Sequence, residues 1–304
     1  MDRKGKEPVA VQKPQEEAPK QVPEFTLEQM NLLLGNQPQF LGEGLSEVYK
    51  GELVVAVKQF YKTERMLEEL NNYSKLSHPN IVKLVGYYKA ENDIVQPEDA
   101  EDYPIRSSLL VEFMPEGDLF DYLFEGNKPL LSWDKRISIL LDIAKALTYL
   151  HEQGLVYRDL KAKNVLLDSE LRAKLCDFGS LVPDRASAPY EGISGYFEVC
   201  TLRDGTPQIF HDVHAFGVLM LEVMLQRRAF KTKLGIKKSL VSKYYTMRLK
   251  RRAANMPSKK MNGEFEVQSL EALLKIAERC LLEEPTNYMR METVMKELEK
   301  WSKS

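Results

Sequence analysis

The chain has 304 residues, of which 43% are hydrophobic and 29% charged, so it can bury a sizeable core as one large domain or as two lobes. Its formal net charge of -2 at pH 7 gives no whole-molecule reason to bind nucleic acid. No apolar run approaches the roughly 20 residues of a transmembrane segment. The few cysteines are widely spaced and form no CxxC pair. We therefore expect a cytoplasmic protein without a nucleic-acid partner.

The N-terminal segment is predicted to have two parts. Residues 1–24, MDRKGKEPVAVQKPQEEAPKQVPE, contain no aromatic residue and mix Pro, Lys, Glu and Gln. Such a composition cannot bury enough apolar area to offset its ordering entropy, which predicts a disordered tail. The periodicity of FTLEQMNLLL then predicts a short helical lead-in over residues 25–38, with Thr26 as its N-cap and Gly35 as its end.

Residues 39–114 are predicted to be rich in strands. Short apolar segments separated by Gly or polar links are typical of hairpins. A helix over residues 62–76 interrupts them. The acidic insert ENDIVQPEDAED, which we interpret as a solvated loop, separates the last two strands. The strand candidates are 39–45, 47–53, 54–60, 81–90 and 107–114.

Beyond residue 115 the apolar residues recur with the period of helices. Strands first and helices later predict an α+β fold with two lobes, the second over residues 115–301. Residues 226–260 are rich in Lys and Arg and contain no Asp or Glu, which indicates an exposed helix-and-loop face or, alternatively, a surface for an anionic partner. Helices are predicted over 119–124, 132–153, 211–225, 270–282 and 290–302.

The charged segment GLVYRDLKAKNVLLD, residues 154–168, lies between a predicted core helix and a short apolar run. A solvated loop is one interpretation. The other is a reaction site, in which Asp159 orients and deprotonates a hydroxyl and Lys161 stabilises a transferring negative group. In that interpretation Asn164 binds a cation.

Two features upstream suit an anionic ligand. The segment LGEGLSEVYKG places Gly42 and Gly44 at a strand-turn-strand, where backbone amides can approach phosphates without interference from a Cβ atom. Lys58 lies inside the apolar strand VAVK, and a buried ammonium is costly unless an anion pairs with it. Glu69 on the following helix is a suitable partner. On their own, these two residues are equally consistent with a structural ion pair.

The segment LCDFG completes the set, because Asp177 ends a predicted strand and Gly179 permits a sharp reversal. Asp177 and Asn164 carry the hard oxygen ligands that Mg²⁺ prefers, with phosphates and water in its other positions. These residues together indicate a phosphoryl-transfer site.

The ordered set GEG, VAVK, Glu69, SHPNIVKL, YRDLKAKN, DFG and DVHAFGV, over about residues 40–301, resembles the protein kinase family. FTLEQMNLLL, LVEFMPEGDL and LSWDKRISILLDIAKALTYLHEQG are similar to plant receptor-like and receptor-like cytoplasmic kinases. Lys161 in DLKAKN resembles Ser/Thr-type catalytic loops. The resemblance implies a bilobal fold, in which a small antiparallel sheet with one main helix precedes a larger helical lobe. It also implies ATP and Mg²⁺ as cofactors.

The resemblance assigns roles to individual residues. The adenine ring would be enclosed by Leu41, Val48, Ala56 and Leu166. Val111 would occupy the gatekeeper position, and the hinge would run from Glu112 to Met114. On the phosphate side, beneath Gly42 and Gly44, Lys58 would hold the α- and β-phosphates and pair with Glu69. Mg²⁺ would be bound by Asn164 and Asp177. Asp159 would be the base, with Lys161 beside it, and Asp212 would brace the catalytic loop from below.

Several positions depart from the family's pattern. Glu47 replaces the third glycine of the phosphate loop, and Tyr157 replaces the usual His before Arg-Asp, which puts the loop geometry in question. GISGYFEVC stands in place of GTxGYxAPE, with Ile193 for Thr and Cys200 for Glu. Tyr288 stands where the Arg partner of that Glu is expected. Replacing both ends of a buried ion pair can be nearly neutral in stability.

Two functions are therefore compatible with the sequence. The first is a protein Ser/Thr kinase that phosphorylates a protein substrate in plant receptor-linked or immune signalling. The second is a pseudokinase adaptor that binds ATP weakly or not at all and acts by protein-protein contacts, with Lys250, Arg251 and Arg252 as its preferred partner site. In either case an upstream receptor or immune receptor is an expected partner, which could recruit the protein to the plasma membrane.

Overall fold

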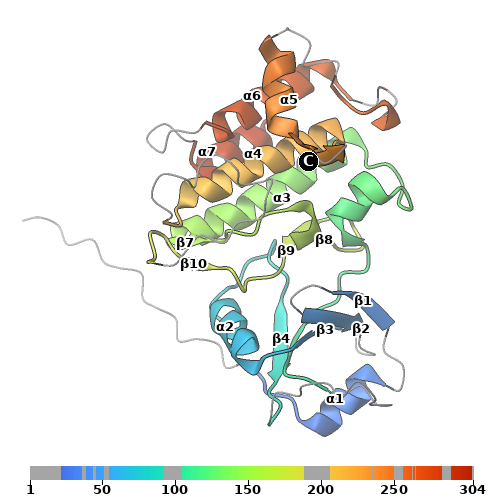
Figure 1. Ribbon diagram of the computed structural model, residues 1–304, viewed down its shortest axis with the longest axis vertical. Coiled ribbons are helices and arrows are strands. Elements are labelled where there is room, and N and C mark those ends of the chain that lie inside the picture. The colour runs from blue at the N-terminus through green and yellow to red at the C-terminus, as the bar shows by residue number, and fades with distance from the viewer. Residues whose placement is uncertain are drawn as a thin grey trace, which may run out of the picture.

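The computed structural model describes residues 22–35, 39–43, 46–50, 55–91, 105–187, 206–233, 236–249, 256–261, 263, 265–282 and 289–302. They form two lobes, a smaller one built on an antiparallel sheet and a larger helical one (Figure 1). This is the α+β, bilobal architecture that the sequence predicts. In the part of the chain that is described, no helix is both long enough and apolar enough to cross a membrane.

The smaller lobe contains a five-stranded sheet in the order β1-β2-β3-β5-β4. Successive side chains of a strand point to opposite faces, so Val55 and Val57 pack with α1 on one face, while Lys58 on the other face reaches α2. The predicted strands and helix are confirmed within a few residues. Their bounds are β1 Gln39–Glu43, β2 Ser46–Lys50, β3 Val55–Phe60, α2 Thr63–Tyr73, β4 Leu84–Tyr88 and β5 Ser108–Glu112.

Helix α1, Leu27–Leu34, is the predicted lead-in helix. The Thr26 hydroxyl accepts from the Gln29 amide at 3.2 Å, and the Gln29 side chain accepts from the Thr26 amide at 2.8 Å, which forms the capping box. Gly35 ends the helix with a φ of 62°. The buried side of α1 covers an apolar face of the sheet that would otherwise contact water.

The segment just before α1 forms an additional edge of the sheet. The Phe25 amide donates to the Tyr87 carbonyl at 2.7 Å, and the Tyr87 amide donates to the Pro23 carbonyl at 3.0 Å. Gly86 permits this approach, because a Cβ atom there would overlap the Phe25 ring and lie 2.9 Å from the Pro23 carbonyl oxygen. The predicted tail over residues 1–24 is therefore wrong at Pro23 and Glu24, whose backbone pairs with β4. Residues 1–21 lie outside the described residues.

The larger lobe is organised around α3, Trp133–Glu152, and α4, Ile209–Leu225, which lie side by side (Figure 1). Almost every residue of α4 is buried, which explains why its sequence is apolar on all sides. Helices α6, Val267–Cys280, and α7, Met291–Glu299, cover this pair. The helices predicted here are confirmed, and the segment predicted over 119–124 ends in a π-helical turn, Asp121–Glu125.

Short strands in the larger lobe hold the loops that carry charged residues. They form a three-stranded sheet in the order β6-β8-β9 and a two-stranded sheet of β10 and β7. Their bounds are β6 Gly117–Asp118, β7 Leu155–Val156, β8 Val165–Leu167, β9 Ala173–Leu175 and β10 Val182–Pro183.

The basic segment after α4 differs from the prediction of helix and loop alone. It forms a hairpin of β11, Phe230–Lys233, and β12, Ile236–Ser239, followed by α5, Leu240–Leu249. Phe230 packs against the main core, an anchor that the lysine-rich composition does not reveal. Residues 250–255, which include the predicted partner site Lys250, Arg251 and Arg252, lie outside the described residues.

Candidate functional site

One ammonium group joins three elements at the boundary between the lobes. Lys58 Nζ on β3 lies 2.8 Å and 3.0 Å from the two carboxylate oxygens of Glu69 on α2, and 3.0 Å from Asp177 Oδ1 after β9. The Lys58 side chain is 16% exposed and that of Glu69 only 3%. Burial alone would lower the pKa of Lys58, but the charges of Glu69 and Asp177 raise it above its ordinary value. Lys58 is therefore a permanent cation, paired as predicted.

The pKa values of the two carboxylates around Lys58 shift in opposite directions. Burial raises the pKa of Glu69, and the charge of Lys58 offsets this only in part. Burial also pushes the pKa of Asp177 upward, but the charge of Lys58 outweighs it, so the pKa of Asp177 is lowered. Asp177 is consequently ionised at neutral pH and, with its side chain 40% exposed, can bind a further cation.

The backbone around Asp177 is held in a specific turn. Asp177 has a φ of 61°, in the left-handed region that few non-glycine residues adopt. A Cβ atom on Gly179 would lie 3.2 Å from Glu69 Oε2, so glycine suits this close approach. Asn72 of α2 donates to the Phe178 carbonyl at 3.0 Å. The orientation of Asp177 therefore depends on the position of α2.

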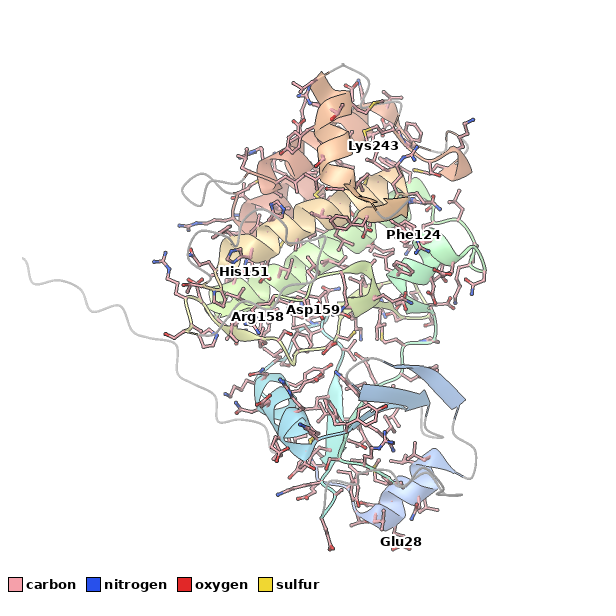
Figure 2. All side chains as sticks on the ribbon, in the orientation of Figure 1. Glu28, Phe124, His151, Arg158, Asp159 and Lys243 are labelled. Atoms are coloured by element: carbon pink, nitrogen blue, oxygen red, sulfur yellow. The ribbon has the colours of Figure 1, made fainter. Side chains whose placement is uncertain are left out.

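Asp159 lies on the side of the larger lobe that faces the smaller lobe (Figure 2), and Lys161 and Asn164 contact its carboxylate. Lys161 Nζ lies 2.9 Å and 3.1 Å from its carboxylate oxygens, and Asn164 Nδ2 donates to Asp159 Oδ2 at 2.7 Å and to its carbonyl at 2.9 Å. Burial raises the pKa of Asp159, and Lys161 offsets part of that rise. Because the Asn164 amide nitrogen is used on Asp159, the side-chain oxygen of Asn164 is left as an acceptor for a cation.

Asp212 on α4 braces the loop before Asp159, at the place that the resemblance implies. Its Oδ2 accepts from the Tyr157 amide at 2.7 Å and its Oδ1 from the Arg158 amide at 2.8 Å. Arg158 has a φ of 70°, so these bonds hold a strained residue directly before Asp159. His151 Nε2 on α3 also lies 3.0 Å from Asp212 Oδ2. The role of His151 was not predicted, because no spacing rule links two residues so far apart in sequence.

Tyr157 occupies the position where the family's pattern has a His. Its hydroxyl donates to the carbonyl of Cys176, and its buried ring lies 5.5 Å from that of Phe178. Phe178 in turn lies 4.8 Å from Tyr73 of α2, between ring centroids. The sequence left the loop geometry in question at this position, and in the structure the tyrosine itself joins the loop before Asp159 to the turn at Asp177.

Some predicted adenine contacts lie at the same boundary. Ala56 and Met114 are buried, Leu166 is half-buried on β8, and Leu41 is exposed on β1. The strand register places Val111 opposite Ala56. The backbone register also places Gly42 opposite Val48, and Val48 opposite Lys58, so the first two strands lie beside the Lys58 pair.

Other predicted positions lie outside the described residues. These include Gly44 of the phosphate loop and all of residues 188–205, with Ile193 and Cys200. Tyr288 lies outside them too. Glu47 and Val48 belong to β2 by their backbone.

Comparisons with known proteins agree with this geometry. Residues 38–298 match the family model described as protein kinase domain. The chain is 34% identical over 286 residues to L-type lectin-domain containing receptor kinase I.7 of Arabidopsis thaliana, covering 86% of this chain and 40% of that protein. It is 34% identical over 265 residues to Probable serine/threonine-protein kinase PBL3 of the same plant, covering 81% and 58%. The chain thus spans about half the length of these curated relatives.

Proposed function

The chain belongs to the protein kinase family, and we propose on this premise that it transfers the γ-phosphate of ATP to a Ser or Thr hydroxyl of a protein substrate. The observation that carries the proposal is a pair of charged clusters, one that joins the two lobes and one within the larger lobe. Lys58 is paired with Glu69 and Asp177, and Asp159 is paired with Lys161 and Asn164. A structural ion pair alone would not require the second cluster.

The charges in this region fit a nucleotide with Mg²⁺. Lys58 would hold the α- and β-phosphates while Glu69 keeps its ammonium in place. Asp177 and Asn164 present one carboxylate and one amide oxygen, the hard ligands that Mg²⁺ prefers, with phosphate oxygens and water as the others. Bound Mg²⁺ would neutralise charge on the phosphates. The adenine ring would be enclosed by Leu41, Val48, Ala56 and Leu166.

Asp159 is the proposed general base. Its pKa is raised by burial, yet Lys161 within 2.9 Å favours the ionised form that can accept a proton from a hydroxyl. The Asn164 amide fixes the orientation of the carboxylate. Lys161 would also stabilise the negative charge on the phosphoryl group during transfer. The hydrogen bonds to Asp212 hold Asp159 and Lys161 in place relative to the turn at Asp177.

The setting that we propose is plant signalling. The relatives include receptor kinases and serine/threonine-protein kinases of Arabidopsis thaliana, which supports a receptor-linked role for this chain. We propose immune signalling as one such role. We further propose a cytoplasmic location with recruitment to the plasma membrane by a receptor or immune-receptor partner.

A second candidate function is a pseudokinase adaptor. It is favoured by the sequence around the expected substrate platform, where Ile193 and Cys200 replace residues of the family's pattern and Glu47 alters the phosphate loop. The paired charges around Lys58 and Asp159 favour catalysis instead, because an adaptor has no need for a positioned base.

Nucleotide binding by the purified chain separates these functions. The thermal midpoint is measured with ATP alone, with Mg²⁺ alone and with both, for the native chain and for Asp177→Asn. A kinase site predicts a rise in the midpoint that is larger with Mg²⁺ and that Asp177→Asn reduces. A rise without Mg²⁺ dependence would favour the adaptor, and no rise would contradict the proposed nucleotide site.

A further inference from the structure

The carboxylate of Glu112, at the end of β5, is tied to the other lobe. Lys174 Nζ on β9 lies 2.8 Å from both of its oxygens, a bidentate ion pair across the lobe boundary. The Lys83 amide donates to Glu112 Oε1 at 2.7 Å, and the Glu112 amide donates to the Lys83 carbonyl at 2.9 Å. Glu112 is thus held through its side chain and its backbone at once.

The surroundings of Lys174 fix its position. The Val82 amide donates to the Leu175 carbonyl at 2.9 Å, and the Leu175 amide donates to the Asn80 carbonyl at 2.9 Å, so the segment before β4 pairs with β9. Asn80 Nδ2 also donates to the Ala173 carbonyl at 3.0 Å. Ala173 and Leu175, on either side of Lys174, are fully buried. The lysine therefore extends from a strand that cannot shift without disrupting the core.

The ion pair between Lys174 and Glu112 is partly shielded from solvent. The Lys174 side chain is 19% exposed and that of Glu112 is 28% exposed, so solvent screens this pair less than it screens a surface pair. Bidentate charge-assisted contacts also restrict geometry more than a single bond does. Two residues further on, the Met114 carbonyl accepts from the Gly117 amide at 3.2 Å. The segment from Glu112 to Met114, which connects the lobes, is thus held at both ends.

We propose that Lys174 is a positioning residue for the nucleotide. By holding Glu112 it sets the backbone geometry from Glu112 to Met114, the segment whose peptide groups would hydrogen-bond the adenine base. Lys174 itself contacts no phosphate and takes no part in the transfer step. This inference rests on the proposed function only in its nucleotide part, since the ion pair exists in the chain without a ligand.

The test compares Lys174→Met with a matched control, Arg172→Met. Arg172 precedes β9, its Nε lies 2.8 Å from Asp168 Oδ2, and its side chain is 60% exposed, so the control also removes an ion pair but leaves Glu112 alone. Hydrogen exchange of residues 110–116 is measured without nucleotide, and kcat and KM for ATP are measured with it.

In Lys174→Met, exchange of this segment is expected to be about 3- to 10-fold faster. KM for ATP is expected to rise by a similar factor of about 3 to 10, with little change in kcat. Arg172→Met should change neither quantity. The charge-reversed pair Lys174→Glu with Glu112→Lys should recover part of the slow exchange.

Unchanged exchange in Lys174→Met would overturn the inference, and so would a fall in kcat with an unchanged KM. If the native chain binds no ATP, the proposed function fails. Exchange of residues 110–116 would then still decide whether Lys174 holds Glu112.

Discussion

The hydroxyl of Tyr157 donates to the backbone carbonyl of Cys176, which joins the catalytic loop to the residue before Asp177. The amide of the same tyrosine donates to Asp212. One residue therefore links the proposed base Asp159, the proposed Mg²⁺ ligand Asp177 and the buried helix α4. A change at this residue should affect both stability and catalysis.

Tyr157→Phe tests this link directly. The variant leaves the Cys176 carbonyl without its donor in a buried setting, which is expected to lower the free energy of unfolding by about 1–3 kcal/mol. Urea unfolding measures that loss, and kcat should fall with it. Tyr245→Phe, on the exposed side of α5, is the control and should change stability by less than about 0.5 kcal/mol. Equal effects of the two variants would contradict the assigned role.

A second prediction concerns the ion pair between Lys58 and Glu69. Lys58→Met leaves Glu69 buried without its cation, which is expected to cost about 3–5 kcal/mol of stability. The double variant Lys58→Met with Glu69→Gln removes the uncompensated charge and should recover a large part of that loss. Both variants should fail to bind ATP. If the double variant is as unstable as the single one in urea unfolding, the loss does not arise from the stranded carboxylate.

Gly86 and Phe25 make a third prediction. Gly86→Ala places a methyl group against the Phe25 ring and the Pro23 carbonyl, and is expected to cost about 1–3 kcal/mol by overpacking. Phe25→Leu reduces the ring that occupies this space. The loss in the double variant should therefore be smaller than the sum of the two single losses in thermal unfolding. Additive losses would show that the segment before α1 does not pack on β4.

His214 predicts a dependence of stability on pH. Burial, aided by His211, lowers the pKa of His214 from 6.5 to about 4. Between these values the unfolded chain binds a proton that the folded chain excludes, so stability rises with pH from about 4 to 6.5 and is lost as the pH falls. The loss from pH 7 to pH 5 should be about 2 kcal/mol. Urea unfolding at both pH values measures it. His214→Gln should abolish this part of the slope, and an unchanged slope would contradict the assignment.

Contacts between residues close in sequence could be expected from local rules, whereas the contact of Asp212 with residues 157 and 158 was expected only from the family resemblance. Asp159, Lys161 and Asn164 lie within six residues of one another, and Thr26 precedes a regular helical pattern, so local rules locate them. The spacing of the apolar residues likewise predicted α3 and α4, because the residues that pack in the core recur with the period of a helix.

The features that escaped prediction depend on contacts between distant segments. Glu112 and Lys174 are 62 residues apart, and His151 and Asp212 are 61 apart. No local pattern pairs them, since each contact follows from how the lobes and helices pack. The same applies to Pro23 and Glu24, whose position is set by backbone pairing with the edge of β4.

The proposed phosphotransfer depends on Asp159 as the general base. The most direct measurement is transfer of labelled γ-phosphate from ATP with Mg²⁺ to protein hydroxyls by the purified native chain and by Asp159→Asn. The variant keeps the size of the side chain but removes its proton-accepting charge. Incorporation by the native chain is expected, with a loss of about 100-fold or more in the variant and with ATP binding intact in both. Binding of ATP without incorporation by the native chain, or equal incorporation by both proteins, would contradict the proposal.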